Sequence, residues 1–141
     1  MISVPDRTGW LEGELAGYPP IPPFPQLTRF ERRALDAIAE GSVPDAQAFR
    51  SQIEACVVID RVNTVVGFVT RTVIDRAAAA PLDFAHRSAH FEVRGTRYGM
   101  SVTLWAEEGF LSSIEGITYG EDDLGGQALA DLDFDGFQLL E

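Results

Sequence analysis

The side chains best suited to chemistry lie in the stretch SSIEGITYGEDD, which spans residues 112–123. An apolar strand pattern runs there into two glycines and an acidic run. The residues with binding potential are Glu115, Tyr119, Glu121, Asp122 and Asp123. Carboxylates attract cationic groups, and tyrosine is a frequent energetic anchor of protein interfaces. The stretch is therefore either a binding edge or the end of a core strand, with a bulge at Gly116 and an exit from the sheet at Gly120.

Three alternating aspartates, Asp131, Asp133 and Asp135, precede Gly136 and match the first half of a calcium-binding EF-hand loop. The bidentate glutamate of such a loop belongs about six residues beyond the glycine, past the end of the printed sequence, and Glu141 falls short of that position. The apolar residues between the aspartates instead indicate an edge strand. We therefore expect a strand with solvated acidic neighbours rather than a metal site.

A second metal candidate combines Asp83 with the two histidines, His86 and His90. Histidines four residues apart share one face of a helix and can bind a metal there, and the segment after Pro81 can form a short helix. The glutamate of an H-E-x-x-H arrangement is missing, and a third ligand would have to come from elsewhere. We expect these histidines to lie in a loop without a metal.

Catalytic patterns are sparse. The sequence contains no G-x-S-x-G motif, and Ser112 and Ser113 lie within a strand pattern. The candidate acid–base residues are spread over strands and a turn; they are Glu92, Glu107, Glu108 and Glu115. All eleven basic residues are arginine, so Schiff-base and P-loop chemistry, which need a lysine amine, are excluded. We leave enzymatic activity open, favour its absence, and expect no cofactor.

Two helices should open the folded part of the chain. Thr28 and Glu31 form a capping box, an apolar stripe follows, and Gly41 ends the first helix. The second helix should begin at residues 42–45, and its apolar stripe runs to Cys56. Cys56 is expected to belong to the core and to be unreactive.

Strand patterns occupy the remainder. Two β-branched runs meet at a turn near residues 61–63, Gly67 indicates a bulge or a close backbone approach, and residues 76–90 form a loop. A hairpin turns at residues 107–109, with a bulge near residues 112–113 or at Gly116. Hairpin connections imply antiparallel pairing, so we expect an α+β fold with the helix pair on one face of about five strands.

The chain divides into a proline-rich arm, residues 1–26, and a single domain, residues 27–141. GYPPIPPFPQ contains five prolines in ten residues, which favours an extended arm that lays aromatic side chains on the domain. Those side chains are Trp10, Tyr18 and Phe24. A PxxP ligand at residues 20–23 is the alternative, which the absence of a neighbouring arginine disfavours.

Charge is the strongest signal of the whole sequence. Its 141 residues carry a net charge of −11, which repels nucleic acid and anionic membranes and attracts basic partners. A single cysteine, the lack of a signal-peptide pattern and the lack of a long apolar run favour a cytoplasmic protein.

Three stretches carry a family resemblance: LTRFERRALDAI, VVGFVTRTVI and LSSIEGITYGED, which together extend over residues 27–122. Their order resembles that of a family of small, uncharacterised bacterial cytoplasmic proteins. The resemblance implies a small α+β domain and no established activity or catalytic residues.

Together these features favour a non-enzymatic acidic module that binds a basic protein, with an immunity-type inhibitor of a basic toxin or effector as its specific form. The alternative is a small-ligand or enzymatic domain with a pocket between helices and sheet. That pocket would be lined by Phe68, Arg94, Arg97 and Trp105. A homodimer joined through the last strand or the arm is a third possibility.

Overall fold

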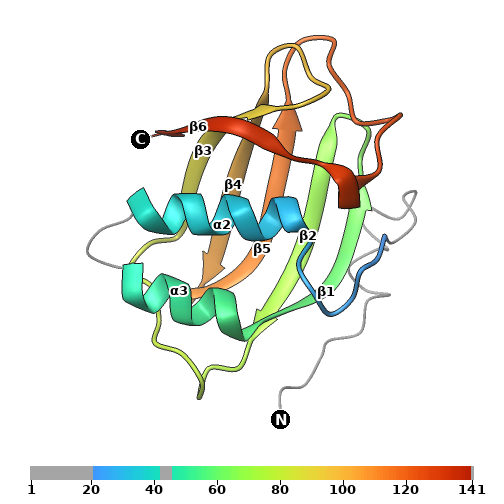
Figure 1. The fold of residues 1–141 in the computed structure, drawn as a ribbon. Helices are drawn as coiled ribbons and strands as arrows, with labels where there is room; N and C mark the ends of the chain where they lie inside the picture. Colours follow the sequence, from blue (N-terminus) through green and yellow to red (C-terminus); the bar gives the residue numbers. More distant parts are fainter. Residues whose placement is uncertain (1–20, 42–45, 141) are drawn as a thin grey trace.

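The computed structural model describes residues 21–41 and 46–140. Helices α2 (Arg29–Gly41) and α3 (Ala46–Ala55) lie on one face of a six-stranded antiparallel sheet (Figure 1). The strands are β1 (Cys56–Asn63), β2 (Gly67–Ile74), β3 (His86–Val93), β4 (Met100–Glu107), β5 (Phe110–Thr118) and β6 (Phe134–Leu140), with a short 3-10 helix, η1 (Leu129–Asp131), before β6. Their order is β1-β2-β5-β4-β3-β6. The α+β prediction is confirmed, with six strands where about five were expected.

Helix α2 begins at the predicted capping box. The N–H of Glu31 donates to the Thr28 hydroxyl at 3.1 Å, and the N–H of Thr28 donates to the Glu31 carboxylate at 2.8 Å. These bonds satisfy donors that the first turn of a helix leaves open. The apolar stripe then buries Phe30, Leu35 and Ile38, each at most 1% exposed, against the sheet. The helix therefore supplies the centre of the core.

Helix α3 is joined to its surroundings by the buried amide of Gln52. Its Nε2 donates to the carbonyls of Ala80 and Gly109, both at 2.8 Å, and its Oε1 accepts from the N–H of Leu111 at 2.9 Å. A buried amide must find such partners, because leaving its polar atoms unsatisfied costs about 1–3 kcal/mol. Gln52 thereby links the helix to the β2–β3 connection and to the β4–β5 turn.

Two element boundaries differ from the prediction. Cys56, expected in the apolar stripe of the second helix, is the first residue of β1 and pairs with Ile74. The turn expected near residues 61–63 lies at residues 64–66, because β1 continues to Asn63. Arg61, predicted to lie in the turn, instead lies within β1 and its side chain is buried.

The β4–β5 hairpin turns where the sequence predicts. Glu108 (φ 53°) and Gly109 (φ 88°) both have left-handed backbone, as a two-residue hairpin turn requires. The pairing register shifts after the Trp105–Ser113 pair and leaves Ser112 as the extra residue of a bulge. The prediction of a bulge near residues 112–113 is confirmed.

The bulge considered at Gly116 is absent, because this residue pairs regularly with Phe68 and Val102. A Cβ atom at Gly116 would lie 2.4 Å from both the Met100 sulfur and the Phe68 ring. Packing of the two neighbouring side chains thus requires the glycine. Gly67 fits its predicted role of close approach, since a Cβ there would lie 1.8 Å from the Gly116 carbonyl oxygen.

Residues 21–26, the last part of the predicted arm, run along the outer edge of β1. The N–H of Ile21 donates to the Arg61 carbonyl at 2.6 Å, and the N–H of Val58 donates to the Pro25 carbonyl at 2.8 Å. These bonds occupy backbone groups that an edge strand otherwise exposes. One edge of the sheet is therefore covered by the chain's own N-terminal segment.

The ring of Phe24 is half-buried and lies 5.9 Å from the Arg61 guanidinium carbon, so this aromatic residue packs on the domain as predicted. Trp10 and Tyr18, expected to do the same, lie outside the described residues. The expected start of the second helix at residues 42–45 also lies outside them.

The helices cover only one face of the sheet, and the opposite face is open in part. Trp105 on β4 is 40% exposed there.

The segment expected as a loop to residue 90 instead becomes β3 from His86 onward, so the helical placement of the two histidines does not occur. Within residues 21–41 and 46–140, no helix is long and apolar enough to cross a membrane.

Candidate functional site

Three connections meet at one end of the sheet, opposite the β4–β5 turn (Figure 1). They are the β1–β2 turn at residues 64–66, the β3–β4 turn at residues 94–99, and the segment after β5 at residues 119–128. The N–H of Leu124 donates to the Val65 carbonyl at 2.5 Å. Backbone hydrogen bonds thus hold the segment after β5 against the β1–β2 turn.

Large apolar side chains are exposed at this end instead of being buried. Val65, Val66, Tyr98 and Ile117 are 47–58% exposed, and Tyr119 is 39% exposed. We call the surface formed by Val65, Val66, Tyr98, Ile117, Tyr119 and Glu121 the loop-end surface. Contiguous exposed apolar groups bordered by polar ones are typical of protein interaction sites.

Two of the predicted acidic residues, Asp122 and Asp123, hold the connections of the loop-end surface in place. The Asp122 carboxylate accepts the N–H of Arg97 at 2.9 Å and the N–H of Tyr98 at 2.8 Å, which joins the β3–β4 turn to the segment after β5. Asp123 accepts the N–H of Gly125 at 3.0 Å and fixes the following turn. Asp122 and Asp123 therefore position the loop as well as contributing negative charge.

The remaining predicted binding residues divide between two places. Tyr119 lies beside His90, with ring centroids 5.6 Å apart, and Glu121 is exposed in the next turn. Glu115 lies away from them, in the middle of β5 on the open face of the sheet. The structure thus brings four of the five residues to the loop end and places Glu115 at a second site.

A depression of about 320 Å³ separates the two connections of the loop-end surface. Arg97, Tyr98, Glu121 and Asp122 line it, and the Arg97 guanidinium carbon lies 6.0 Å from the centroid of the Tyr98 ring. The depression presents carboxylates and an aromatic ring side by side. This combination suits an incoming cationic side chain.

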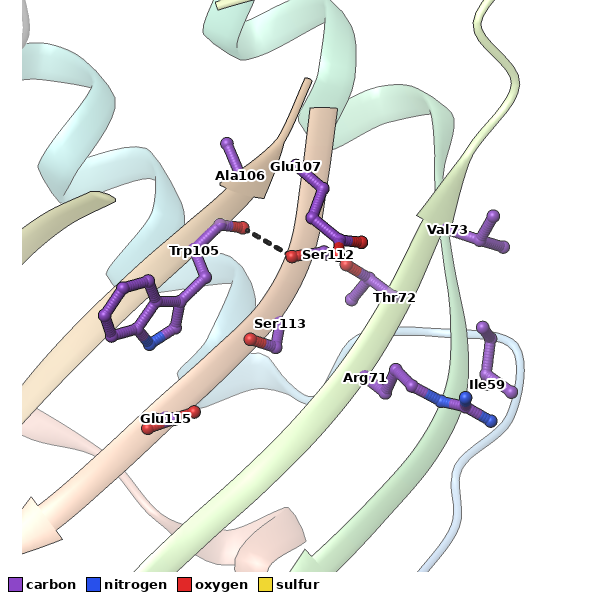
Figure 2. Close-up of a pocket in the computed structure, with 10 residues that line it drawn as sticks. All are labelled: Ile59, Arg71, Thr72, Val73, Trp105, Ala106, Glu107, Ser112, Ser113 and Glu115. Atoms are coloured by element: carbon purple, nitrogen blue, oxygen red, sulfur yellow. Dashed lines mark hydrogen bonds between the residues drawn. The ribbon is translucent and has the colours of Figure 1, made fainter. Parts of the chain in front are cut away.

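The open face of the sheet carries a larger depression, of about 550 Å³. Figure 2 shows the Trp105 indole and the Arg71 side chain on opposite sides of β5, with Ser113 and Glu115 between them. The Ser112 hydroxyl donates to the Trp105 carbonyl at 3.2 Å, so the bulge residue is engaged locally. Aromatic, cationic and anionic groups together line this second candidate site.

The four residues of the alternative pocket are not brought together. Phe68 is buried in the core beneath α2, whereas Trp105 lies on the opposite face of the sheet. Arg94 and Arg97 share a depression of about 460 Å³ beside the β3–β4 turn. The prediction that Phe68 and Trp105 line one pocket between helices and sheet fails because their side chains lie on different faces of the sheet.

Two of the three aspartates of the EF-hand-like stretch, Asp133 and Asp135, pair with arginines. Asp133, only 13% exposed, pairs with Arg33, and Asp135 accepts from Arg94 at 2.6 and 2.9 Å. The Arg94 hydrogen bond lowers the pKa of Asp135 below its ordinary value and raises that of Arg94. The expectation of solvated acidic neighbours is therefore wrong for Asp133, and Asp131 lies apart in η1.

The histidines face aromatic residues. The His86 ring lies 5.3 Å from the Trp105 ring, and His90 contacts Tyr119. Asp83 precedes β3 and is exposed. In the part of the chain that the structure describes, no three histidine, cysteine or acidic side chains are grouped so as to hold a metal.

Sequence reasoning missed the buried ion pair of Arg61 and Glu31, each 1% exposed. Arg61 donates to both Glu31 oxygens, at 2.6 and 2.7 Å, and to the carbonyls of Ile21, Pro23 and Gln26 at 2.8–3.2 Å. All five guanidinium N–H donors are thereby satisfied. The β-branched residues on both sides of Arg61 favour a strand over a turn, and this pattern could have indicated that Arg61 lies within the sheet.

The single cysteine is not poised for chemistry. Burial, followed by the negative charge of Glu31, raises the pKa of Cys56 to about 12, although the Thr72 side chain donates a hydrogen bond that opposes the shift. The thiol is therefore protonated at neutral pH, and the thiolate is the form that attacks electrophiles.

Comparisons with protein families, with curated protein sequences and with solved structures found no match. The family resemblance of the three quoted stretches accordingly remains a prediction.

Proposed function

We propose that the protein is a non-enzymatic binding module that holds a basic protein partner at the loop-end surface. The observation that carries this proposal is the exposure of two tyrosines, Tyr98 and Tyr119, beside carboxylates at one end of the sheet. Tyrosines supply large contact areas with little loss of side-chain freedom, and they are enriched among the residues that dominate binding energy.

The electrostatic contribution comes from the whole chain and from the site. A net charge of −11 attracts a basic protein from a distance and raises its rate of association. At contact, Glu121 and Asp122 are available to pair with arginine or lysine side chains of the partner. Long-range attraction and short-range recognition therefore favour the same class of partner.

An immunity-type inhibitor of a basic toxin or effector is the specific form of this function that we favour. The support is the small size and acidity of the chain, together with the exposed tyrosines beside carboxylates at the loop end. Toxicity of the captured partner when expressed alone, relieved by co-expression of this chain, would support this form. A harmless partner would exclude the inhibitor while leaving the binding module in place.

The binding module is tested by capture on the immobilised full-length chain from an extract of its native cells. We expect a basic protein to be retained at low salt and released at high salt, because salt screens exposed charges. The double variant Tyr98→Ser, Tyr119→Ser should lose the retained protein. The control Trp105→Ser removes a similarly exposed aromatic residue from the open face and should retain it.

The dependence of capture on charge is tested with a matched pair of variants. Glu121→Gln removes one negative charge from the loop-end surface, whereas Glu40→Gln removes one from the exposed end of α2. We expect the first change to weaken capture several-fold and the second to have little effect. Equal retention by the double tyrosine variant and the wild type would overturn the proposal.

A second candidate is small-ligand binding in the depression on the open face. It rests on the exposed Trp105 ring, with Arg71 across β5 from it and Glu115 between them, a set that suits a ligand with both a flat apolar face and polar groups (Figure 2). A thermal-shift screen of metabolites tests it: stabilisation of the wild type that Trp105→Ser abolishes would support the candidate. No stabilisation by any compound would count against it.

A further inference from the structure

Within the part of the chain that the structure describes, the edge of the sheet at β1 is covered, whereas the edge at β6 is open. Residues 21–26 hydrogen-bond along the outer edge of β1, whereas β6 pairs with β3 on one side and, among the described residues, with no strand on the other. An edge strand presents unpaired N–H and C=O groups that accept another strand. The chemistry of this edge therefore selects an extended polypeptide as its occupant.

The exposed edge also lacks the usual protection against pairing. Phe137, Leu139 and Leu140 are 43%, 36% and 42% exposed, and residues 137–140 contain no charged side chain. Natural edge strands are commonly protected by charges, prolines or bulges. In β6 the register irregularity lies before residue 137, so the exposed part pairs regularly with β3.

We infer that β6 pairs antiparallel with β6 of a second copy of this chain and forms a continuous sheet across a dimer. The inference is independent of the proposed function, because β6 contributes no residue to the loop-end surface. Its occupant is a second copy and not the basic partner, because an uncharged strand offers nothing that selects a cationic protein.

The strand is complementary to itself. Antiparallel pairing centred on Gln138 places Phe137 opposite Leu139 of the second copy, and the reverse, on the same face of the joined sheet. Both side chains already lie on the helix-covered face, where Phe137 stacks on Phe91 and Leu139 reaches the end of α2 at Gly41. Aromatic–aliphatic cross-strand pairs of this kind stabilise antiparallel sheets.

Charge and area set the strength of the dimer. Two chains of net charge −11 repel each other, so the dimer should strengthen as salt screens that repulsion. A single strand pair buries less than the roughly 1,200–2,000 Å² of a standard stable interface, so we expect a weak dimer. Salt is thus predicted to favour dimerisation and to oppose capture of the basic partner.

Sedimentation equilibrium of the full-length chain over a hundredfold range of concentration, at low and high salt, tests the inference. We expect a reversible monomer–dimer equilibrium that shifts toward dimer at high salt. Leu140→Lys, which adds a charge to the exposed strand, should shift it to monomer. The control Ile117→Lys adds the same charge to an exposed position on interior strand β5 and should leave the dimer in place.

Backbone hydrogen exchange supplies the second measurement. Amides of β6 should exchange more slowly as protein concentration rises, while amides of the turn at residues 64–66 should not change. A chain that remains monomeric under all conditions would overturn the inference, as would a dimer that Leu140→Lys leaves intact without concentration-dependent protection of β6.

Discussion

Arg61 shows how a single side chain organises the N-terminal part of this protein. Its guanidinium joins the Glu31 carboxylate of α2 to the backbone of residues 21–26, and the Thr70 hydroxyl donates to the same carboxylate. A buried charge without its partner is far more costly than the intact pair is stabilising. The pair therefore fixes the position of the arm segment more than it contributes net stability.

Replacing Arg61 by methionine should lower the free energy of unfolding by about 3–5 kcal/mol, because the Glu31 carboxylate is left buried without its cation. Urea denaturation measures this change. Adding Glu31→Leu to the same chain should recover part of the loss, since no isolated charge then remains. A loss below about 1 kcal/mol for Arg61→Met would contradict this account of the pair.

The Cys56 thiol gives a prediction of pH dependence. Its pKa is about 12 in the folded protein and 9.0 in the ordinary environment of an unfolded chain. The unfolded state therefore loses its proton first as pH rises. The contribution of this thiol to the free energy of unfolding should be constant below about pH 9 and should fall between pH 9 and about 12, by at most about 1.4 kcal/mol per pH unit.

Denaturant titrations of the wild type and of Cys56→Ala at several alkaline pH values test this difference. The variant lacks the titrating thiol, so its stability should fall less steeply over that range. Parallel pH profiles for the two proteins would show that the thiol is not the source of the effect.

Among the elements, the hairpin sheet depends on a glycine in the middle of a strand. Gly116→Ala should destabilise the protein by about 1–3 kcal/mol, because the added methyl group overlaps the Met100 and Phe68 side chains. Gly126→Ala is the matched control: no atom lies within 4 Å of its added carbon, and its effect should stay within about 0.5 kcal/mol. Equal stability of the two variants in urea would refute the packing argument.

Local signals predicted most of the elements. The capping box defined the start of α2, and the acidic–glycine turn defined the β4–β5 hairpin, because both depend on residues close in sequence. The position of the β1–β2 turn was mistaken because the burial of Arg61 depends on Glu31, which lies thirty residues away in the sequence. Strand order likewise depends on long-range contacts that no local pattern encodes.

The candidate site was predictable only where its residues are consecutive. Tyr119, Glu121, Asp122 and Asp123 share one segment, so the sequence identified them together. Tyr98 belongs to the same surface but comes from the β3–β4 turn, and long-range hydrogen bonds, including those to Asp122, bring the two segments into contact. Glu115 was grouped by sequence proximity, although its side chain lines the depression on the open face.

For the whole molecule, charge and topology have separate consequences. The helices bury one face of the sheet, the arm segment covers the β1 edge, and the loop-end surface and β6 leave apolar side chains exposed. We expect the net negative charge to favour a basic partner at the loop-end surface and to oppose self-association at β6. The balance between partner binding and dimerisation should therefore depend on ionic strength.

The most direct test of the central claim is site-specific photo-cross-linking in native-cell extract at low salt. A photoreactive phenylalanine derivative replaces either Tyr98 on the loop-end surface or Trp105 on the open face, two exposed aromatic residues. The account predicts that position 98 cross-links a basic protein and that position 105 does not. Cross-linking of that protein from position 105 alone would contradict the account and assign binding to the open face.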